Sequence, residues 1–183
     1  MKCKYCGLSA GIFSKVHQEC EEKHRKGMAE VSANLRSFFQ GTDKFSTVLT
    51  KKKQAEQCNF FSMKDWEYAC LEALKNYTDS IKPPIGKQHL QTVDLFLNNA
   101  GIPRTTLNQK GDLDRLSSRL YEGILLAFFA ENQAMSKIEQ RIQMLTRLLP
   151  MSGEQKERAG LVILDKAADK FLSDGLISQQ EQT

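Results

Sequence analysis

Four metal-ligand side chains are concentrated in the first twenty residues, in the pattern Cys3-x2-Cys6-x10-His17-x2-Cys20. Three thiolates and one imidazole are a ligand set that tetrahedral Zn²⁺ takes in closed structural sites. A Cys-x2-Cys pair lets two thiolates converge from one tight turn, and Gly7 suits the left-handed backbone that such turns use. The spacing therefore predicts one structural zinc ion held by these four side chains, with no open coordination position for a reacting water.

The same spacing predicts how the ligands are presented. His17 and Cys20 are three residues apart, so at the start of a helix they share one face. The ten-residue spacer is long enough for a small hairpin through Ala10 and Gly11. A knuckle, a hairpin and a helix whose first turn supplies the last two ligands would form a treble-clef-like module over residues 1–26.

Two other interpretations of these side chains stay open. The cysteines could be free thiols beside a surface histidine, or His24 could replace His17 as the fourth ligand, although it lacks the three-residue spacing to Cys20. Cys58 and Cys70 have no ligand-like partners nearby in the sequence. Cys70 falls on an apolar helix face, where it is most simply a small core residue.

The cysteine usage also bears on the compartment. The chain has five cysteines, an odd number, and its first six residues lack the apolar core of a secretory signal. Clustered Cys and His without an export signal favour metal binding in a reducing cytoplasm over disulfides. The longest unbroken apolar run covers residues 124–130, whereas a bilayer span needs about 20 residues, so we expect no membrane helix.

The rest of the chain has the three-to-four periodicity of amphipathic helices. We expect helices over about 15–39, within 42–61, from Ser62 to Pro83-Pro84, from there to Asn99, and over 113–128, 138–149 and 153–174. No alternating strand pattern occurs outside the knuckle. The predicted fold class is therefore all-α, a helical bundle in residues 27–177 with the zinc module at its N-terminus and a polar tail at 178–183.

Capping residues predict where several of these helices begin and end. Ser14 is the expected N-cap of the first helix and Gly41 its stop. Capping boxes are expected at Ser62–Asp65 and at Ser152–Gln155. Pro84 suits the first position of a helix, and residues 101–112 are expected to form a loop.

For two of the helices, the sequence also predicts which residues form the apolar face. The helix after Ser62 should bury Trp66, Ala69, Cys70, Ala73, Leu74 and Tyr77, and the last helix should present Leu161, Leu164, Ala167, Ala168, Phe171 and Leu172. Residues 72–77 and 166–171 are also similar to each other, which indicates either a duplicated helical unit or a chance likeness of two amphipathic helices.

Charge offers a second functional hypothesis. The formal net charge is +4, which does not require a polyanionic partner. Basic residues nevertheless surround the zinc module, and candidate nucleic-acid contacts are Lys2, Lys4, Lys15, Lys51, Lys52 and Lys53. Tyr5 and Phe13 could stack on bases as in zinc knuckles that bind single strands. Alternatively these lysines are solvated faces, and Phe13 closes the small core of the knuckle.

We find no phosphate-binding loop, dinucleotide fingerprint, nucleophile elbow or metallohydrolase motif in the chain. The leading hypothesis is a non-enzymatic cytoplasmic interaction or regulatory protein, with nucleic-acid binding as the alternative. A protein partner is expected, and this partner could be a second copy of the chain. Candidate partner contacts are Phe38, Phe39, Phe60 and Phe61, unless these rings are ordinary core residues.

The opening segment, Cys3 to Gly7 with Gly11-Ile12-Phe13-Ser14-Lys15-Val16-His17-Gln18-Glu19-Cys20, resembles the start of a poorly characterised bacterial family. That family pairs an N-terminal zinc knuckle with a small helical domain similar to the tellurite-resistance B-type domain. Segments 107–111 and 171–178 are similar to its helical part. The resemblance implies zinc at the four ligands, a helical body and a bacterial or phage setting. Pro83-Pro84 departs from the acidic turn of the helical domain, so no acidic metal site is carried over.

Overall fold

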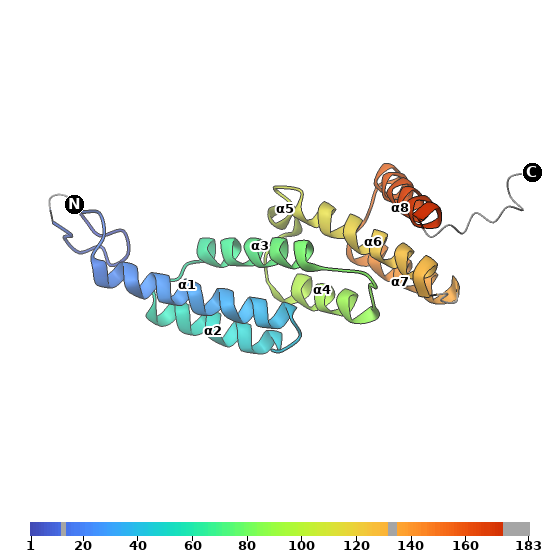
Figure 1. The fold of residues 1–183 in the computed structure, drawn as a ribbon. Helices are drawn as coiled ribbons and strands as arrows, with labels where there is room; N and C mark the ends of the chain where they lie inside the picture. The colour runs from blue at the N-terminus through green and yellow to red at the C-terminus, as the bar shows by residue number, and fades with distance from the viewer. Residues whose placement is uncertain (12–13, 132–134, 174–183) are drawn as a thin grey trace, which may run out of the picture. The chain divides into compact units, whose positions relative to one another are not determined.

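The computed structural model describes residues 1–11, 14–131 and 135–173 of the chain. Within these ranges the protein is all-helical, as predicted, and its only β feature is an isolated bridge between Lys2 and Ser9. The helices are α1 (Gln18–Phe39), α2 (Phe45–Cys58), α3 (Met63–Ser80), α4 (Lys87–Asn99), α5 (Arg104–Leu107), α6 (Asp112–Glu131), α7 (Met135–Leu148) and α8 (Gly153–Ser173) (Figure 1). In these ranges no helix is both long and apolar enough to cross a membrane.

The chain divides into two compact units. Unit 1 consists of Met1–Asp79 and Leu95–Gln109, and unit 2 of Ser80–Asp94 and Lys110–Thr183, so the division falls within α4. The domain boundary expected after residue 26 stays a prediction. The predicted polar tail at 178–183 and the predicted end of the last helix at residue 174 lie outside the described residues.

An antiparallel hairpin of α1 and α2 forms the long side of unit 1 (Figure 1). Gly41 ends α1 with a positive φ of 76°, as its position in the sequence predicts. Near the other end, Gly27 is buried, and a Cβ atom there would lie 2.7 Å from the Cβ of Asn59. The absence of a side chain at Gly27 therefore allows the two helices to approach closely.

Aromatic rings fill the opposite end of this hairpin. Phe38 packs edge-on against Phe45 with ring centroids 5.0 Å apart, and Phe39 stacks on Tyr77 at 4.5 Å. Phe96 of α4 lies 5.0 Å from Phe39. Phe38 and Phe39 are thus engaged in core packing, the alternative that the sequence left open for them.

In the other phenylalanine pair, Phe60 and Phe61, one ring is buried in the core and the other lies at the surface. Phe61 is 5% exposed, whereas Phe60 is 36% exposed. Of the four rings considered as partner contacts, Phe60 is therefore the one that the structure leaves substantially accessible.

Helix α3 begins at the predicted capping box. The backbone N–H of Ser62 donates to Asp65 Oδ2 at 2.8 Å, and the Ser62 hydroxyl donates to the same oxygen at 2.6 Å. Trp66 follows directly and is fully buried, and its indole Nε1–H donates to the carbonyl oxygen of Ala100 at 2.8 Å. The predicted buried face is confirmed at Trp66, Ala69, Cys70, Ala73, Leu74 and Tyr77.

Three predicted boundaries are wrong. His17, not Ser14, occupies the N-cap position of α1, because the Ser14 hydroxyl is engaged with Val16 in a local turn. Helix α4 starts at Lys87, so Pro84 is not its first residue. The expected loop at 101–112 contains the short helix α5, and α6 already begins at Asp112.

In unit 2, α6 packs against both α7 and α8 (Figure 1). Its buried side chains include Leu116, Leu120 and Ile124, and α7 contributes Ile138 and Leu145. The second predicted capping box is confirmed at the start of α8. The N–H of Ser152 donates to Gln155 Oε1 at 2.8 Å, and the N–H of Gln155 donates to the Ser152 hydroxyl at 3.1 Å.

The predicted apolar face of α8 is wrong at its first two positions. Leu161 is 57% exposed and Leu164 is 59% exposed, whereas Ala159 and Ile163 are buried. The helix is therefore turned about its axis relative to the prediction, and Ala168 is exposed as well. The side chains of Ala167, Phe171 and Leu172 lie outside the described part of the structure.

Candidate metal centre

The four predicted ligands, Cys3, Cys6, His17 and Cys20, lie together in the structure. One ligand atom from each falls within 4.8 Å of all the others. The Nδ1 atom of His17 is 3.2 Å from Cys6 Sγ and 3.8 Å from Cys20 Sγ. The prediction that these side chains form one cluster is therefore confirmed.

The first two ligands are presented by a tight backbone turn. The N–H of Gly7 donates to the Cys3 carbonyl at 2.9 Å, and Gly7 itself has a φ of 74°, which glycine adopts without strain. The N–H of Cys3 donates to the Leu8 carbonyl at 2.7 Å, which closes the turn. The predicted hairpin through Ala10 and Gly11 runs into residues 12–13, outside the described ranges.

The other two ligands come from the start of α1. Cys20 is in the first turn of the helix, and His17 is the residue that precedes its first helical position. The N–H of Lys4 donates to the Lys15 carbonyl at 3.0 Å and so joins the knuckle to the segment leading into α1. Both pairs of ligands are thus held by backbone hydrogen bonds.

The orientation of the His17 ring suits a metal ligand. Its Nε2 atom is 2.8 Å from the Ser9 carbonyl oxygen, which accepts a hydrogen bond only from the tautomer protonated at Nε2. Nδ1 is then left with a lone pair directed at the cysteine sulfurs. An imidazole that donates its second N–H to a backbone carbonyl is the usual arrangement around protein-bound metals.

The sulfur atoms do not ionise equally. Burial by itself raises the pKa of the Cys3 thiol, but backbone N–H groups of Cys6, His17 and Tyr5 lower it to about 6. Burial and then the neighbouring Cys6 and Cys3 sulfurs raise the pKa of Cys20 to about 11. Three thiolates in one cluster repel one another, and a bound dication would offset that repulsion.

This donor set discriminates among metals. Three sulfurs and one imidazole nitrogen suit Zn²⁺ and other soft or borderline ions, whereas Mg²⁺ and Ca²⁺ require oxygen ligands. The residues present therefore fit a closed, four-coordinate metal site. Zinc is one of the ions that such a site would accept.

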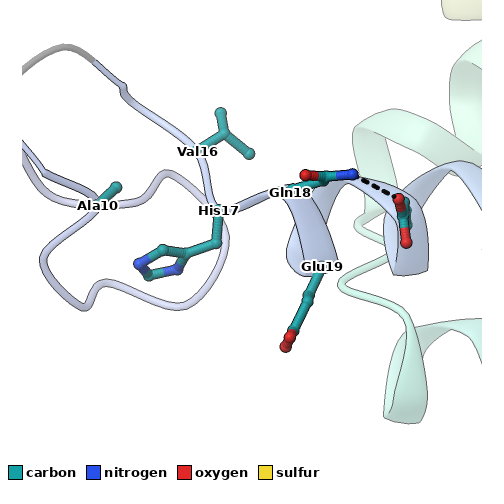
Figure 2. Close-up of a pocket in the computed structure, with 6 residues that line it drawn as sticks. Ala10, Val16, His17, Gln18 and Glu19 are labelled. Carbon is teal, nitrogen blue, oxygen red and sulfur yellow. Dashed lines mark hydrogen bonds between the residues drawn. The ribbon is translucent and has the colours of Figure 1, made fainter.

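A hollow of about 810 Å³ opens beside the cluster. Figure 2 shows its lining residues and labels Ala10, Val16, His17, Gln18 and Glu19, with the His17 ring on the side of the knuckle loop. Glu22 completes the lining and accepts a hydrogen bond from Gln18 Nε2 at 3.2 Å. The carboxylates of this hollow are not part of the ligand cluster.

His24 is not a fourth ligand. Its Nε2 atom lies 3.0 Å from Asp65 Oδ1, and its ring stacks on Tyr5 with centroids 4.8 Å apart. The interpretation in which His24 replaces His17 is therefore wrong. Sequence reasoning missed the pairing of His24 with Asp65, because nothing in the local pattern around either residue indicates the other.

Two of the candidate nucleic-acid contacts, Lys52 and Lys4, have defined neighbours in the structure, and the binding of nucleic acid by this set stays a prediction. Lys52 Nζ pairs with Glu56 at 2.6 Å and lies over the Trp66 ring, 5.6 Å from its centroid. Lys4 Nζ lies over the ring of Tyr5, 4.6 Å from its centroid. Lys52 and Tyr5 are thus engaged in contacts within the protein.

The remaining candidate lysines are distributed over two elements. Lys2 and Lys15 are exposed on the knuckle module, and Lys51 and Lys53 are on α2, half-buried and exposed respectively. Phe13 lies outside the described residues.

No family model, curated protein or solved structure matches this chain. What the structure itself establishes is an all-helical protein with an N-terminal cluster of three cysteines and one histidine that could hold a metal ion. The family resemblance beyond that cluster stays a prediction.

Proposed function

We propose that this chain is a non-enzymatic interaction or regulatory protein whose N-terminal module is folded by one structural Zn²⁺. The observation that carries the proposal is the convergence of four soft or borderline ligand atoms within 4.8 Å. The five cysteines are free, which supports a reducing, cytoplasmic setting.

The ion would act by joining two segments. Cys3 and Cys6 belong to the knuckle, whereas His17 and Cys20 belong to the start of α1. A module of this size cannot bury enough apolar surface to fold alone, so metal binding would supply much of its folding free energy. The bound ion would fix the knuckle in one orientation on the first helix and present its surface to a protein partner.

The buried cysteine outside the cluster, Cys70, supports a non-catalytic role. Burial raises the pKa of the Cys70 thiol, which makes this side chain a poor nucleophile at neutral pH. Four protein ligands would also fill the metal's coordination sphere and leave no position for a reacting water. The proposal therefore assigns the metal to folding and not to chemistry.

Native mass spectrometry of the purified protein tests the metal. We expect one zinc per chain in the wild type and none in Cys6→Ser. The matched control is Cys58→Ser, because Cys58 is exposed and outside the cluster, and it should retain the full zinc content. A wild-type protein that carries no zinc after purification without chelators would overturn the proposal.

The same spectrum bears on the alternative function. Nucleic-acid binding through the knuckle and Lys51–Lys53 has less support, since Lys52 and Tyr5 are already engaged within the protein. A retained nucleic-acid adduct that is lost steeply with salt would favour that alternative. One zinc per chain without an adduct would favour the protein-interaction role.

A further inference from the structure

The outer face of α8 carries apolar side chains that the fold does not use. Leu161 and Leu164 are more than half exposed, although both lie on a helix whose other face is buried against α6. At 100° per residue, these leucines point away from the buried Ala159 and Ile163. Ala168 continues the same line, since the spacing 161, 164, 168 follows the three-and-four steps of a helix-pairing seam.

Opposite charges flank this seam on one side. Arg158 and Asp165 are both exposed and are seven residues apart, so they occupy equivalent positions along the helix. Arg158 has an ion pair with Glu154 at 3.2 Å, but both side chains are about four-fifths exposed. Such a pair is worth little in water and exchanges readily for another partner.

The leucines and flanking charges of one α8 helix are complementary to those of a second α8 helix when the two helices are antiparallel. If a second α8 lies antiparallel on the first, Leu161 faces Leu164 of the second copy, and the two-fold axis repeats that contact. Arg158 then faces Asp165 of the second copy, again twice. In a parallel pair the two flanking charges would not meet, so the charge pattern selects the antiparallel arrangement.

We propose that two copies of this chain associate through antiparallel pairing of α8, with the four leucines at the centre and two Arg158–Asp165 ion pairs at the edge. The apolar centre is small, and the next layer would place Glu157 against Ala168. A contact of this size predicts a weak, reversible dimer and not an obligate one. The inference does not depend on the metal, because α8 belongs to unit 2 and the cysteine cluster to unit 1.

Sedimentation velocity over a range of protein concentrations tests the apolar centre. We expect the wild type to shift from monomer to dimer as concentration rises, and Leu164→Glu to remain monomeric with unchanged helical circular dichroism. Leu95→Glu is the matched control, since Leu95 is 51% exposed on α4 and lies outside the proposed contact. A wild type that stays monomeric to millimolar concentration, or a dimer that survives Leu164→Glu, would overturn the proposal.

Charge reversal tests the orientation. Arg158→Glu and Asp165→Arg should each raise the dimer dissociation constant roughly tenfold or more, because each places like charges opposite each other twice. The double variant should restore the wild-type constant, and an equimolar mixture of the two single variants should form a heterodimer. Single variants that associate like the wild type would rule out the antiparallel pairing.

Metal removal separates this inference from the proposed function. A chelator should leave the α8 dimer intact even where it strips the knuckle of zinc. A dimer that dissociates on chelation but still forms in the Leu164→Glu variant would contradict the α8 contact. Absence of zinc with a dimer still sensitive to Leu164→Glu would overturn the metal proposal alone.

Discussion

His24 of α1 and Asp65 of α3 lie 3.0 Å apart, Nε2 to Oδ1, although 41 positions separate them in the sequence. The same histidine ring stacks on Tyr5 of the knuckle. The same carboxyl group accepts hydrogen bonds from the N–H and hydroxyl of Ser62 at the start of α3. One pair of side chains therefore holds together the knuckle, the first helix and the third.

The first prediction concerns the coupling within this pair. A double-mutant cycle with His24→Ala and Asp65→Asn should give an interaction free energy of about 1 kcal/mol, since both side chains are only partly exposed. Urea denaturation followed by circular dichroism measures the four stabilities. A coupling energy near zero would show that the contact does not contribute to stability.

The second prediction concerns acid. Burial opposes ionisation of Asp65, but the hydrogen bonds from Ser62 and the contact with His24 outweigh it and lower the pKa of the carboxyl group. A carboxyl group whose pKa is lower in the folded state stabilises fully above its unfolded pKa of about 4 and loses this contribution as the pH falls through the folded pKa. The stability gap between wild type and Asp65→Asn should therefore shrink below pH 4. A gap that is the same at pH 7 and pH 3 would contradict this.

The third prediction compares two helical glycines. A Cβ atom at Gly123 of α6 would collide with the buried side chain of Ile85, whereas a Cβ atom at Gly160 of α8 would meet nothing within 4 Å. Gly123→Ala should cost about 1–3 kcal/mol through overpacking. Gly160→Ala should instead stabilise by roughly 0.5–1 kcal/mol, because alanine is the better helix former. Thermal unfolding of the two variants should shift in opposite directions.

The fourth prediction concerns the single tryptophan. Trp66→Phe removes the donor to the Ala100 carbonyl and leaves that buried oxygen unpaired, at a cost of about 1–3 kcal/mol. Tyr68→Phe on the same helix is the control, because Tyr68 is 58% exposed, and it should change stability by no more than about 0.5 kcal/mol. Urea denaturation read by circular dichroism compares them without relying on indole fluorescence. Equal losses of stability in both variants would show that the indole hydrogen bond makes no measurable contribution to the free energy of unfolding.

The fifth prediction concerns metal removal. After chelation we expect trypsin to cut rapidly within residues 1–26, where Lys15 and Lys23 are already exposed. Tryptophan fluorescence should change little, since Trp66 is fully buried and bonded to Ala100. A chelated protein with the same cleavage pattern as the untreated one would argue against a folding role for the metal.

The sequence predicted those features that depend on neighbouring residues. Helical periodicity, the two capping boxes and the glycine stop at Gly41 follow from local geometry, and the structure has all of them. The ligand cluster was predictable for the same reason. Each half of it, Cys3 with Cys6 and His17 with Cys20, is a short-range pattern.

The remaining features depend on contacts between distant residues. Whether Leu161 or Ile163 of α8 is buried is decided by packing against α6, because both positions are apolar and only two residues apart. The contact of His24 with Asp65 likewise requires α1 and α3 to be packed first. The prediction of Ser14 as the N-cap of α1 is wrong because the Ser14 hydroxyl forms hydrogen bonds with the backbone of Val16 in the turn before the helix.

Unit 1 consists of two separate stretches of chain, so its parts become available for folding at different times during synthesis. All four ligands of the cluster have been translated by residue 20, so metal can reach a complete site while the rest of the chain is still being made. Trp66 must wait for Ala100, and the unit is complete only with residue 109. The nascent chain therefore passes through an interval in which all four ligands are present while the apolar faces of the later helices of unit 1 have no partners yet.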